Sequence, residues 1–156
     1  STRLPRAIRD VYKRQILMSR IMGLDLGDKT IGVALSDPFF ITAQAYITIK
    51  RKKASLDIEK LIEIINEKGV NLIIIGLPKN MNNTLGPQAM KVISFVDLLK
   101  KSTDIEIKYQ DERMTTIQSD QVLMDMNVNL KDRKKYVDKI AASFILQTYL
   151  DGRNNG

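Results

Sequence analysis

A continuous apolar run at 71–78, Asn-Leu-Ile-Ile-Ile-Gly-Leu-Pro, constrains the fold of this chain more than any other feature. A run without polar alternation is typical of a strand that is covered on both faces, as the strands of parallel sheets are. Apolar residues of the preceding segment recur at the spacing of one helix face: Ile58, Leu61, Ile62 and Ile65. Ser55 is the expected N-cap of that helix and Gly69 its expected stop. The pattern predicts a helix that leads into a buried strand.

Three β-rich runs with short turns between them precede this helix, at 21–27, 31–37 and 41–50. They predict an antiparallel meander. After the polar loop at 79–88, we expect a helix through Ala89, Ile93, Val96 and Leu99 and then a strand at 105–113. A helix at 115–126 and a polar, mobile segment at 127–135 should follow. The last helix is expected from about Tyr136 to Leu150, with its stop at Gly152.

The order of these elements predicts an α/β fold. A β-meander followed by βαβ units gives a mixed five-stranded sheet with helices on both faces. This plan resembles the ribonuclease H-like domains.

The chain contains neither Cys nor His. Their absence excludes disulfides, thiolate zinc sites and thiol nucleophiles, and it removes the commonest general base. A metal ion in such a protein has to be a hard cation held by carboxylates. That description fits Mg²⁺ or Mn²⁺.

The net charge of +7 is unevenly spread. The first fifteen residues, STRLPRAIRDVYKRQ, hold five basic side chains and one acidic one, or +4 of the +7. We interpret 1–17 as a non-native or disordered leader, with the native start near Met18. Residues 18–152 are then one ribonuclease H-like domain, and 153–156 are a tail. The alternative is a genuine basic arm that touches nucleic acid. No apolar run approaches the ~20 residues that span a bilayer, so we expect no membrane contact and a cytoplasmic location.

Asp25 is the first candidate site residue, because it stands in the apolar strand Ile-Met-Gly-Leu-Asp-Leu-Gly. Strand periodicity places Gly23, Asp25 and Gly27 on one face. A carboxylate in an apolar strand has to be hydrogen-bonded, neutral or metal-bound. The two glycines leave space for ions and a phosphate. A purely structural Asp that caps a loop is the alternative.

Glu112 and Asp111 end the strand predicted at 105–113, where sites of α/β folds usually form. We interpret Asp111 as a solvated strand end and Glu112 as a candidate acid. The neighbouring Arg113 can pair with either carboxylate or bind a phosphate through both guanidinium nitrogens.

Asp138 is the third candidate acid. On a helix it shares its face with Ala141, Ala142 and Ile145, an apolar face that should lie against the sheet. Alone, Asp138 is better explained as a first-turn acid that complements the helix dipole. Together with Asp25 and Glu112 it suits a site in which two divalent ions activate water and stabilise a leaving 3′ oxygen.

Four sequence blocks match one family in order and spacing. They are IMGLDLGDKTIGVALSD, GLPKNMNNTLGPQA, DERMTT and KKYVDKIAASFILQTYLD. From about Arg20 to Asp151 the chain resembles the pre-16S rRNA nuclease family, also called the YqgF or RuvX family and described as Holliday junction resolvase-like. The resemblance implies a ribonuclease H-like nuclease that matures the 5′ end of 16S rRNA. It also implies that Asp25, Glu112 and Asp138 are the catalytic acids and metal ligands.

The same resemblance suggests residues that contact the nucleic acid backbone. Asn83 stands where the family usually has Gly, and Asn tolerates the left-handed turn that this position needs. The candidate backbone contacts are Lys29, Asn82, Gln88, Arg113, Arg133, Lys134 and Lys135. A capped loop and a solvated face are the plain alternatives for most of them.

Three other functions stay open at the level of sequence. The first is a DNA endonuclease that resolves branched junctions with the same acids. The second is a non-catalytic module that binds RNA or RNA polymerase, and a ribosomal subunit is a further conceivable partner. The third, an actin-like ATPase suggested by Asp-Leu-Gly-Asp-Lys-Thr-Ile-Gly, ranks low because such proteins need two domains.

Overall fold

The computed structural model describes residues 5–10, 19–80, 82, 84–112 and 130–155, with only the backbone at 130–136. The helix expected at 115–126 lies outside these residues. Residues 6–10 form one helical turn. The assignment of 1–17 to a leader stays a prediction.

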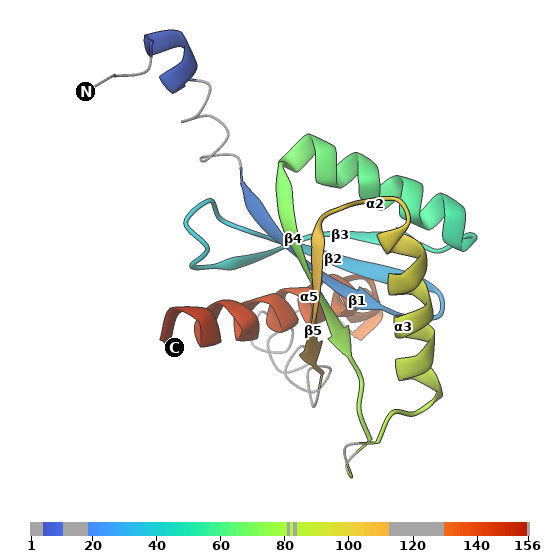
Figure 1. The fold of residues 1–156 in the computed structure, drawn as a ribbon. Helices are drawn as coiled ribbons and strands as arrows, with labels where there is room; N and C mark the ends of the chain where they lie inside the picture. The colour runs from blue at the N-terminus through green and yellow to red at the C-terminus, as the bar shows by residue number, and fades with distance from the viewer. Residues whose placement is uncertain (1–4, 11–18, 81, 83, 113–129, 156) are drawn as a thin grey trace.

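Five strands form one mixed sheet in the order β3-β2-β1-β4-β5 (Figure 1). Their bounds are β1 Arg20–Leu26, β2 Thr30–Ser36, β3 Ala43–Lys50, β4 Val70–Leu77 and β5 Glu106–Asp111. The first three strands pair antiparallel, and β4 pairs parallel with both β1 and β5. The predicted meander and βαβ units are therefore confirmed, with β1 at the centre of the sheet.

Helices cover both faces of the sheet, as expected (Figure 1). The helices α2 (Ala54–Lys68) and α3 (Pro87–Lys100) share one apolar cluster with the sheet, and α5 (Leu130–Asn155) builds a second cluster on the opposite face. The expected bounds of the last helix, 136–150, are too short. The charged residues at its start contain no Gly or Pro, and Lys, Arg and Leu favour helix, so polarity alone does not keep them out of it.

The apolar run at the centre of the sequence is buried on both sides. Ile73 and Ile75 of β4 pack in the cluster with α2 and α3, and Ile74 packs in the cluster with α5. This arrangement confirms the prediction of a strand with two covered faces.

The start of α2 differs from the prediction. Ser55 is not the N-cap, because the helix begins at Ala54, two residues earlier than a cap at Ser55 implies, with Lys53 as the cap residue and no side-chain cap. The buried carboxylate of Asp57 instead accepts the backbone N–H of Lys52 at 3.0 Å and pairs with the Arg51 guanidinium at 3.2 Å. These bonds fix how the chain enters the helix, and they replace an N-cap hydrogen bond.

Glycine stops one predicted helix and not the other. Gly69 adopts the left-handed conformation at φ 66° and ends α2 as expected. Gly152 is helical, and α5 continues past it. The last turn of α5 is held by the loop before β3, since the Arg153 guanidinium lies 4.9 Å from the Phe40 ring centroid and the Asn154 amide donates to the Phe40 carbonyl at 3.1 Å.

Glycines on three neighbouring strands let α5 lie very close to the sheet. A Cβ at Gly23 of β1 would lie 2.7 Å from the Cβ of Leu146, and one at Gly76 of β4 would lie 2.6 Å from another side chain of α5. A Cβ at Gly32 of β2 would overlap the backbone carbonyl oxygen of Asp138. The helix therefore rests on backbone where a side chain would otherwise hold it off.

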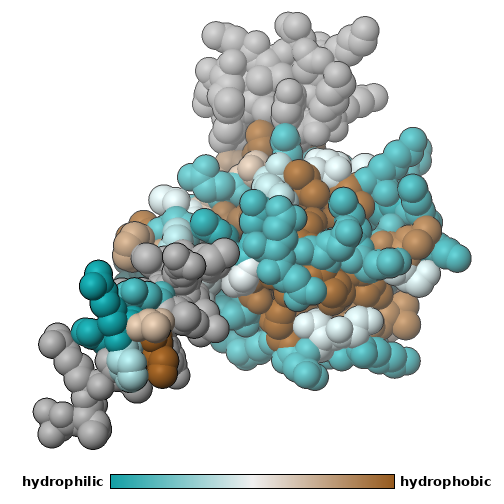
Figure 2. Space-filling model, turned by 90° about the horizontal axis from the view of Figure 1, so that it is seen from above, coloured by the Kyte–Doolittle hydropathy of each residue, from teal (hydrophilic) through white to brown (hydrophobic). Residues whose placement is uncertain are grey.

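The outer surface mixes side chains of both kinds. On the face shown in Figure 2, hydrophilic side chains are interspersed with hydrophobic ones. Among the described residues, no helix is both long and apolar enough to cross a membrane.

We predict that Gly32→Ala destabilises the protein by about 1–3 kcal/mol, because the new methyl group meets helix backbone that cannot rotate away. Gly152→Ala is the matched control, since a Cβ there meets nothing within 4 Å and Ala favours helix. Urea denaturation followed by circular dichroism measures both. Equal stability of Gly32→Ala and the parent would contradict the close packing of α5.

Candidate active site

Asp25 lies near the end of the central strand β1, on the face that α5 covers. Its backbone pairs with Gly32 of β2, and on the other side Leu24 pairs with Ile75 of β4, one residue before Gly76. The carboxyl group is only partly exposed. Asp25 is thus flanked by a glycine on each neighbouring strand.

Glu112 reaches Asp25 from the end of β5 across one of these glycines. Its backbone N–H donates to the Leu77 carbonyl at 3.2 Å, which holds it to the end of β4. A Cβ at Gly76 would lie 2.7 Å from Glu112 Oε2, so the carboxyl group occupies the space above that glycine. The Glu112 and Asp25 side chains are hydrogen-bonded to each other.

Asp138 arrives from α5 across the other glycine. Its backbone lies directly over Gly32, and its Oδ2 accepts a hydrogen bond from the Thr30 hydroxyl at the start of β2. The apolar face that it shares with Ala141 and Ala142 is buried against the sheet, as expected. Asp138 is close enough to raise the pKa of Asp25 by charge repulsion.

Burial and mutual repulsion set the protonation of this cluster. Burial, followed by the charge and the hydrogen bond of Asp25, raises the pKa of Glu112 to about 9. Burial also raises the pKa of Asp25, and the hydrogen bond from Glu112 opposes that rise. At neutral pH the Glu112 carboxyl group therefore keeps its proton, which lies in its hydrogen bond with Asp25.

An acid pair that shares a proton is a place where a cation is electrostatically favoured, since a cation can replace that proton. The donor set is all oxygen, which suits Mg²⁺ or Mn²⁺. Within the described residues, however, no three acidic groups are arranged to hold one ion. Asp25 and Glu112 touch, whereas Asp138 is bonded to Thr30. The assignment of all three as catalytic groups and metal ligands stays a prediction.

The candidate backbone contacts have different surroundings. Lys29 is exposed in the turn after β1. Asn82 is exposed too, but its Oδ1 accepts hydrogen bonds from the backbone and hydroxyl of Thr84, which shape its own loop. The Gln88 amide donates to the Leu26 carbonyl at 3.2 Å and ties α3 to the end of β1. The side chains of Arg113, Arg133, Lys134 and Lys135 lie outside the described residues.

One interpretation of the sequence is wrong. Gly23 does not leave space for ions and a phosphate, because Leu146 and the Ala142 carbonyl fill that space. The glycines that make room for the acids are Gly32 and Gly76, which the sequence analysis did not single out. Strand spacing was the available signal for Gly32. It lies two residues after Thr30 in the first sequence block, so the two residues share one face of the strand.

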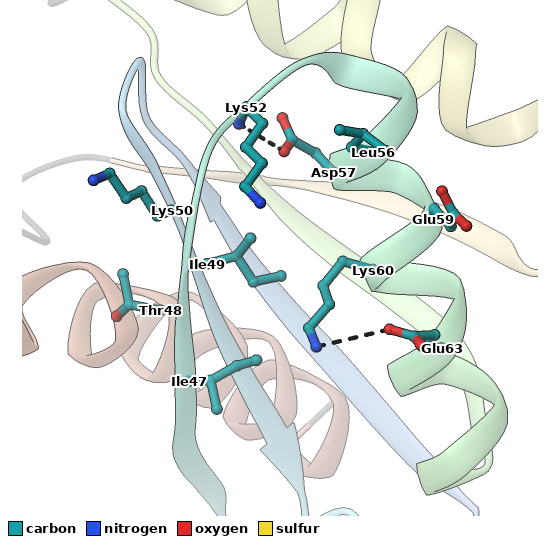
Figure 3. Close-up of a pocket in the computed structure, with 10 residues that line it drawn as sticks. All are labelled: Ile47, Thr48, Ile49, Lys50, Lys52, Leu56, Asp57, Glu59, Lys60 and Glu63. Carbon is teal, nitrogen blue, oxygen red and sulfur yellow. Dashed lines mark hydrogen bonds and ion pairs between the residues drawn. The ribbon is translucent and has the colours of Figure 1, made fainter.

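A groove elsewhere on the domain is separate from these acids. It has a volume of about 450 Å³ and lies between β3 and α2, on the opposite face of the sheet from Asp25 (Figure 3). Charged side chains of both signs line it, and Lys60 pairs with Glu63 at 3.7 Å. The groove does not contain the candidate acids.

Solved structures share this arrangement of sheet and helices. RuvC of T. thermophilus, solved in complex with a Holliday junction substrate, aligns with a TM-score of 0.57 and 12% identity over 88% of this chain and 96% of that chain. The fowlpox virus resolvase, solved with Holliday junction DNA, gives a TM-score of 0.54 and 17% identity over 86% of this chain and 98% of that chain. The fold is therefore ribonuclease H-like, as predicted.

Sequence comparison identifies the family. The model of the family described as "RuvX: Holliday junction resolvase" matches residues 19–152. A protein of Clostridioides difficile (strain 630) named "Putative pre-16S rRNA nuclease" is 53% identical over 140 residues, which cover 90% of this chain and 99% of the relative. A protein of the same name from Clostridium botulinum (strain Hall) is 51% identical over 132 residues, 85% of this chain and 96% of the relative. The chain belongs to the RuvX family, and the resemblance seen in the sequence is confirmed.

We predict that without divalent cations the protein loses stability as the pH rises from about 4.5 towards 9. The folded Glu112 keeps its proton up to a pKa of about 9, while the unfolded chain releases it near the ordinary 4.5, so folding takes up a proton between these values. Glu112→Gln removes the titrating group and keeps a donor to Asp25. Its melting temperature should therefore fall less with pH than that of the parent.

Thermal unfolding in a chelator at pH 5.5, 7 and 8.5 measures the effect. Glu106→Gln on the same strand is the control, because Glu106 is 67% exposed. Parallel pH dependence in the parent and in Glu112→Gln would contradict the shared proton.

Proposed function

We propose that this protein is a metal-dependent nuclease that hydrolyses phosphodiester bonds at the 5′ end of pre-16S rRNA. The observation that carries the proposal is the convergence of Asp25, Glu112 and Asp138 from a strand, a strand end and a helix onto one face of the sheet. Membership of the RuvX family supports hydrolysis of phosphodiester bonds as the reaction class.

Each acid has a distinct part in this proposal. Asp25 and Glu112 form the buried pair that would hold the cation, whose charge would take the place of the shared proton released to solvent. Asp138 completes the ligand set from α5, and the Thr30 hydroxyl holds its carboxylate in place beforehand. Two bound Mg²⁺ or Mn²⁺ ions would supply activation of the attacking water and stabilisation of the leaving 3′ oxygen.

The choice of RNA as substrate follows from the names of the relatives, which are about half identical over nearly their full length. A second candidate, cleavage of branched DNA, is favoured by the fold, because two neighbours of similar structure were solved with Holliday junctions. A binding module without catalysis is the remaining alternative. It predicts binding without cutting.

We predict that Asp25→Asn lowers the cleavage rate at least ~100-fold, because it removes a charge that the metal ions and the transition state require. The assay uses the purified full chain, Mg²⁺ or Mn²⁺, and two substrates, a 5′ precursor fragment of 16S rRNA and a four-way DNA junction. Asp97→Asn, an exposed acid on α3, is the matched control and should cut normally. Unchanged cutting by Asp25→Asn would refute the role of this acid, and a parent that cuts neither substrate would refute the nuclease.

Binding of the metal has a readout that does not depend on cutting. We predict that saturating Mn²⁺ raises the melting temperature of the parent by several degrees, since an ion at 100 times its Kd stabilises by about 2.7 kcal/mol. Asp25→Asn should lose most of this shift, and Asp97→Asn should keep it. An equal shift in all three proteins would place the ion elsewhere.

A further inference from the structure

Lys50 ends the edge strand β3 on the same face of the sheet as the three acids. It pairs directly with Thr30 of β2, and residues that pair across antiparallel strands project to the same face. The Thr30 side chain points to Asp138 on α5. Figure 3 agrees, because Lys50 and Thr48 project to the side of α5 while Ile47 and Ile49 project towards α2.

The Lys50 ammonium group is free for an external partner among the residues that the structure describes. Lys50 is exposed, and the ion pairs found in this part of the chain use other lysines: Lys60, Lys68, Lys91 and Lys108. Lys52 and Lys53 follow Arg51 in the chain and are also exposed, and Lys52 borders the groove between β3 and α2.

The end of β3 is fixed to the turn that follows Asp25. The backbone N–H of Arg51 donates to the Lys29 carbonyl at 2.8 Å, and its guanidinium donates to the Gly27 carbonyl at 2.9 Å. The same guanidinium pairs with the buried Asp57 at 3.2 Å. Lys50 therefore has a backbone position that is defined relative to the acids.

Sheet geometry gives the distance between Lys50 and the acids. One strand, β2, separates β3 from β1, and Lys50 lies two residues beyond Thr48, the β3 residue in register with Asp25. At ~4.8 Å per strand and ~3.4 Å per residue, the backbones of Lys50 and Asp25 are therefore about 12 Å apart. At a rise of ~3.4 Å per nucleotide in one strand of a duplex, this corresponds to about three to four nucleotides. A lysine there is well placed for a phosphate a few nucleotides from the cleaved bond, and not for the bond itself.

We propose that Lys50 binds a backbone phosphate of the nucleic acid a few nucleotides from the cleaved bond, so that the substrate crosses the β3 edge of the sheet. The proposal rests on the proposed function and adds the direction in which the substrate leaves the site. It extends the predicted contacts, because Asn82 and Gln88 belong to the loop and helix that follow β4, on the other side of β1.

The test measures nucleic acid binding by fluorescence anisotropy in the full chain carrying Asp25→Asn, with Mg²⁺, between 50 and 200 mM salt. The probes are the 16S precursor fragment and the four-way junction. Adding Lys50→Ala should weaken binding about 3- to 10-fold and lower the slope of log affinity against log salt by about 0.7–0.9, the loss of one phosphate contact. Lys50→Arg should restore most of both.

Lys60→Ala is the matched control, because Lys60 is exposed on α2 on the opposite face and should leave affinity and slope unchanged. Lys50→Ala that binds like its parent, or that loses no more than Lys60→Ala, overturns the role of Lys50 while leaving the nuclease intact. A loss confined to one probe supports the proposal and names RNA or DNA as the substrate that crosses this edge. Failure of the parent to bind or cut either probe overturns both proposals.

Discussion

The close seating of α5 on the glycines of three neighbouring strands is the contact on which the site depends. Without side chains at Gly23, Gly32 and Gly76, the helix backbone comes down onto the sheet and brings Asp138 over β2. The same lack of a side chain at Gly76 leaves room for the Glu112 carboxyl group. The glycines on the three strands thus allow both the close packing of α5 and the convergence of the acids. A side chain at any of these glycines would disturb both.

The acid cluster is electrostatically unfavourable, and the stability of the surrounding fold offsets this cost. Burial and repulsion make full ionisation of Asp25 and Glu112 unfavourable, and one shared proton relieves the repulsion. Apolar clusters on both faces of the sheet hold the carboxyl groups there. Repulsion between buried carboxylates is typical of cation-binding sites, because a bound cation neutralises the charges that repel each other in the folded protein.

The sequence predicted what depends on periodicity and missed what depends on contacts between distant segments. The burial of the 71–78 run follows from its continuous apolar character, and the position of Asp25 on one strand face follows from strand spacing. The wrong N-cap at Ser55 and the wrong stop at Gly152 have one cause, because bonds from outside each helix override its local signals. The bond from Thr30 to Asp138 joins residues 108 positions apart, a pairing that no local spacing shows.

The position of α5 at the end of the chain gives the protein an order of assembly. During synthesis β1 emerges first, and Asp25 is then an acid in an incomplete sheet. Glu112 follows only after β5, and Asp138 only with the helix that closes the second face. A nascent chain therefore carries no complete acid cluster until α5 has been synthesised. The three acids come together only as the last step of folding, and no partly made sheet presents them as a group.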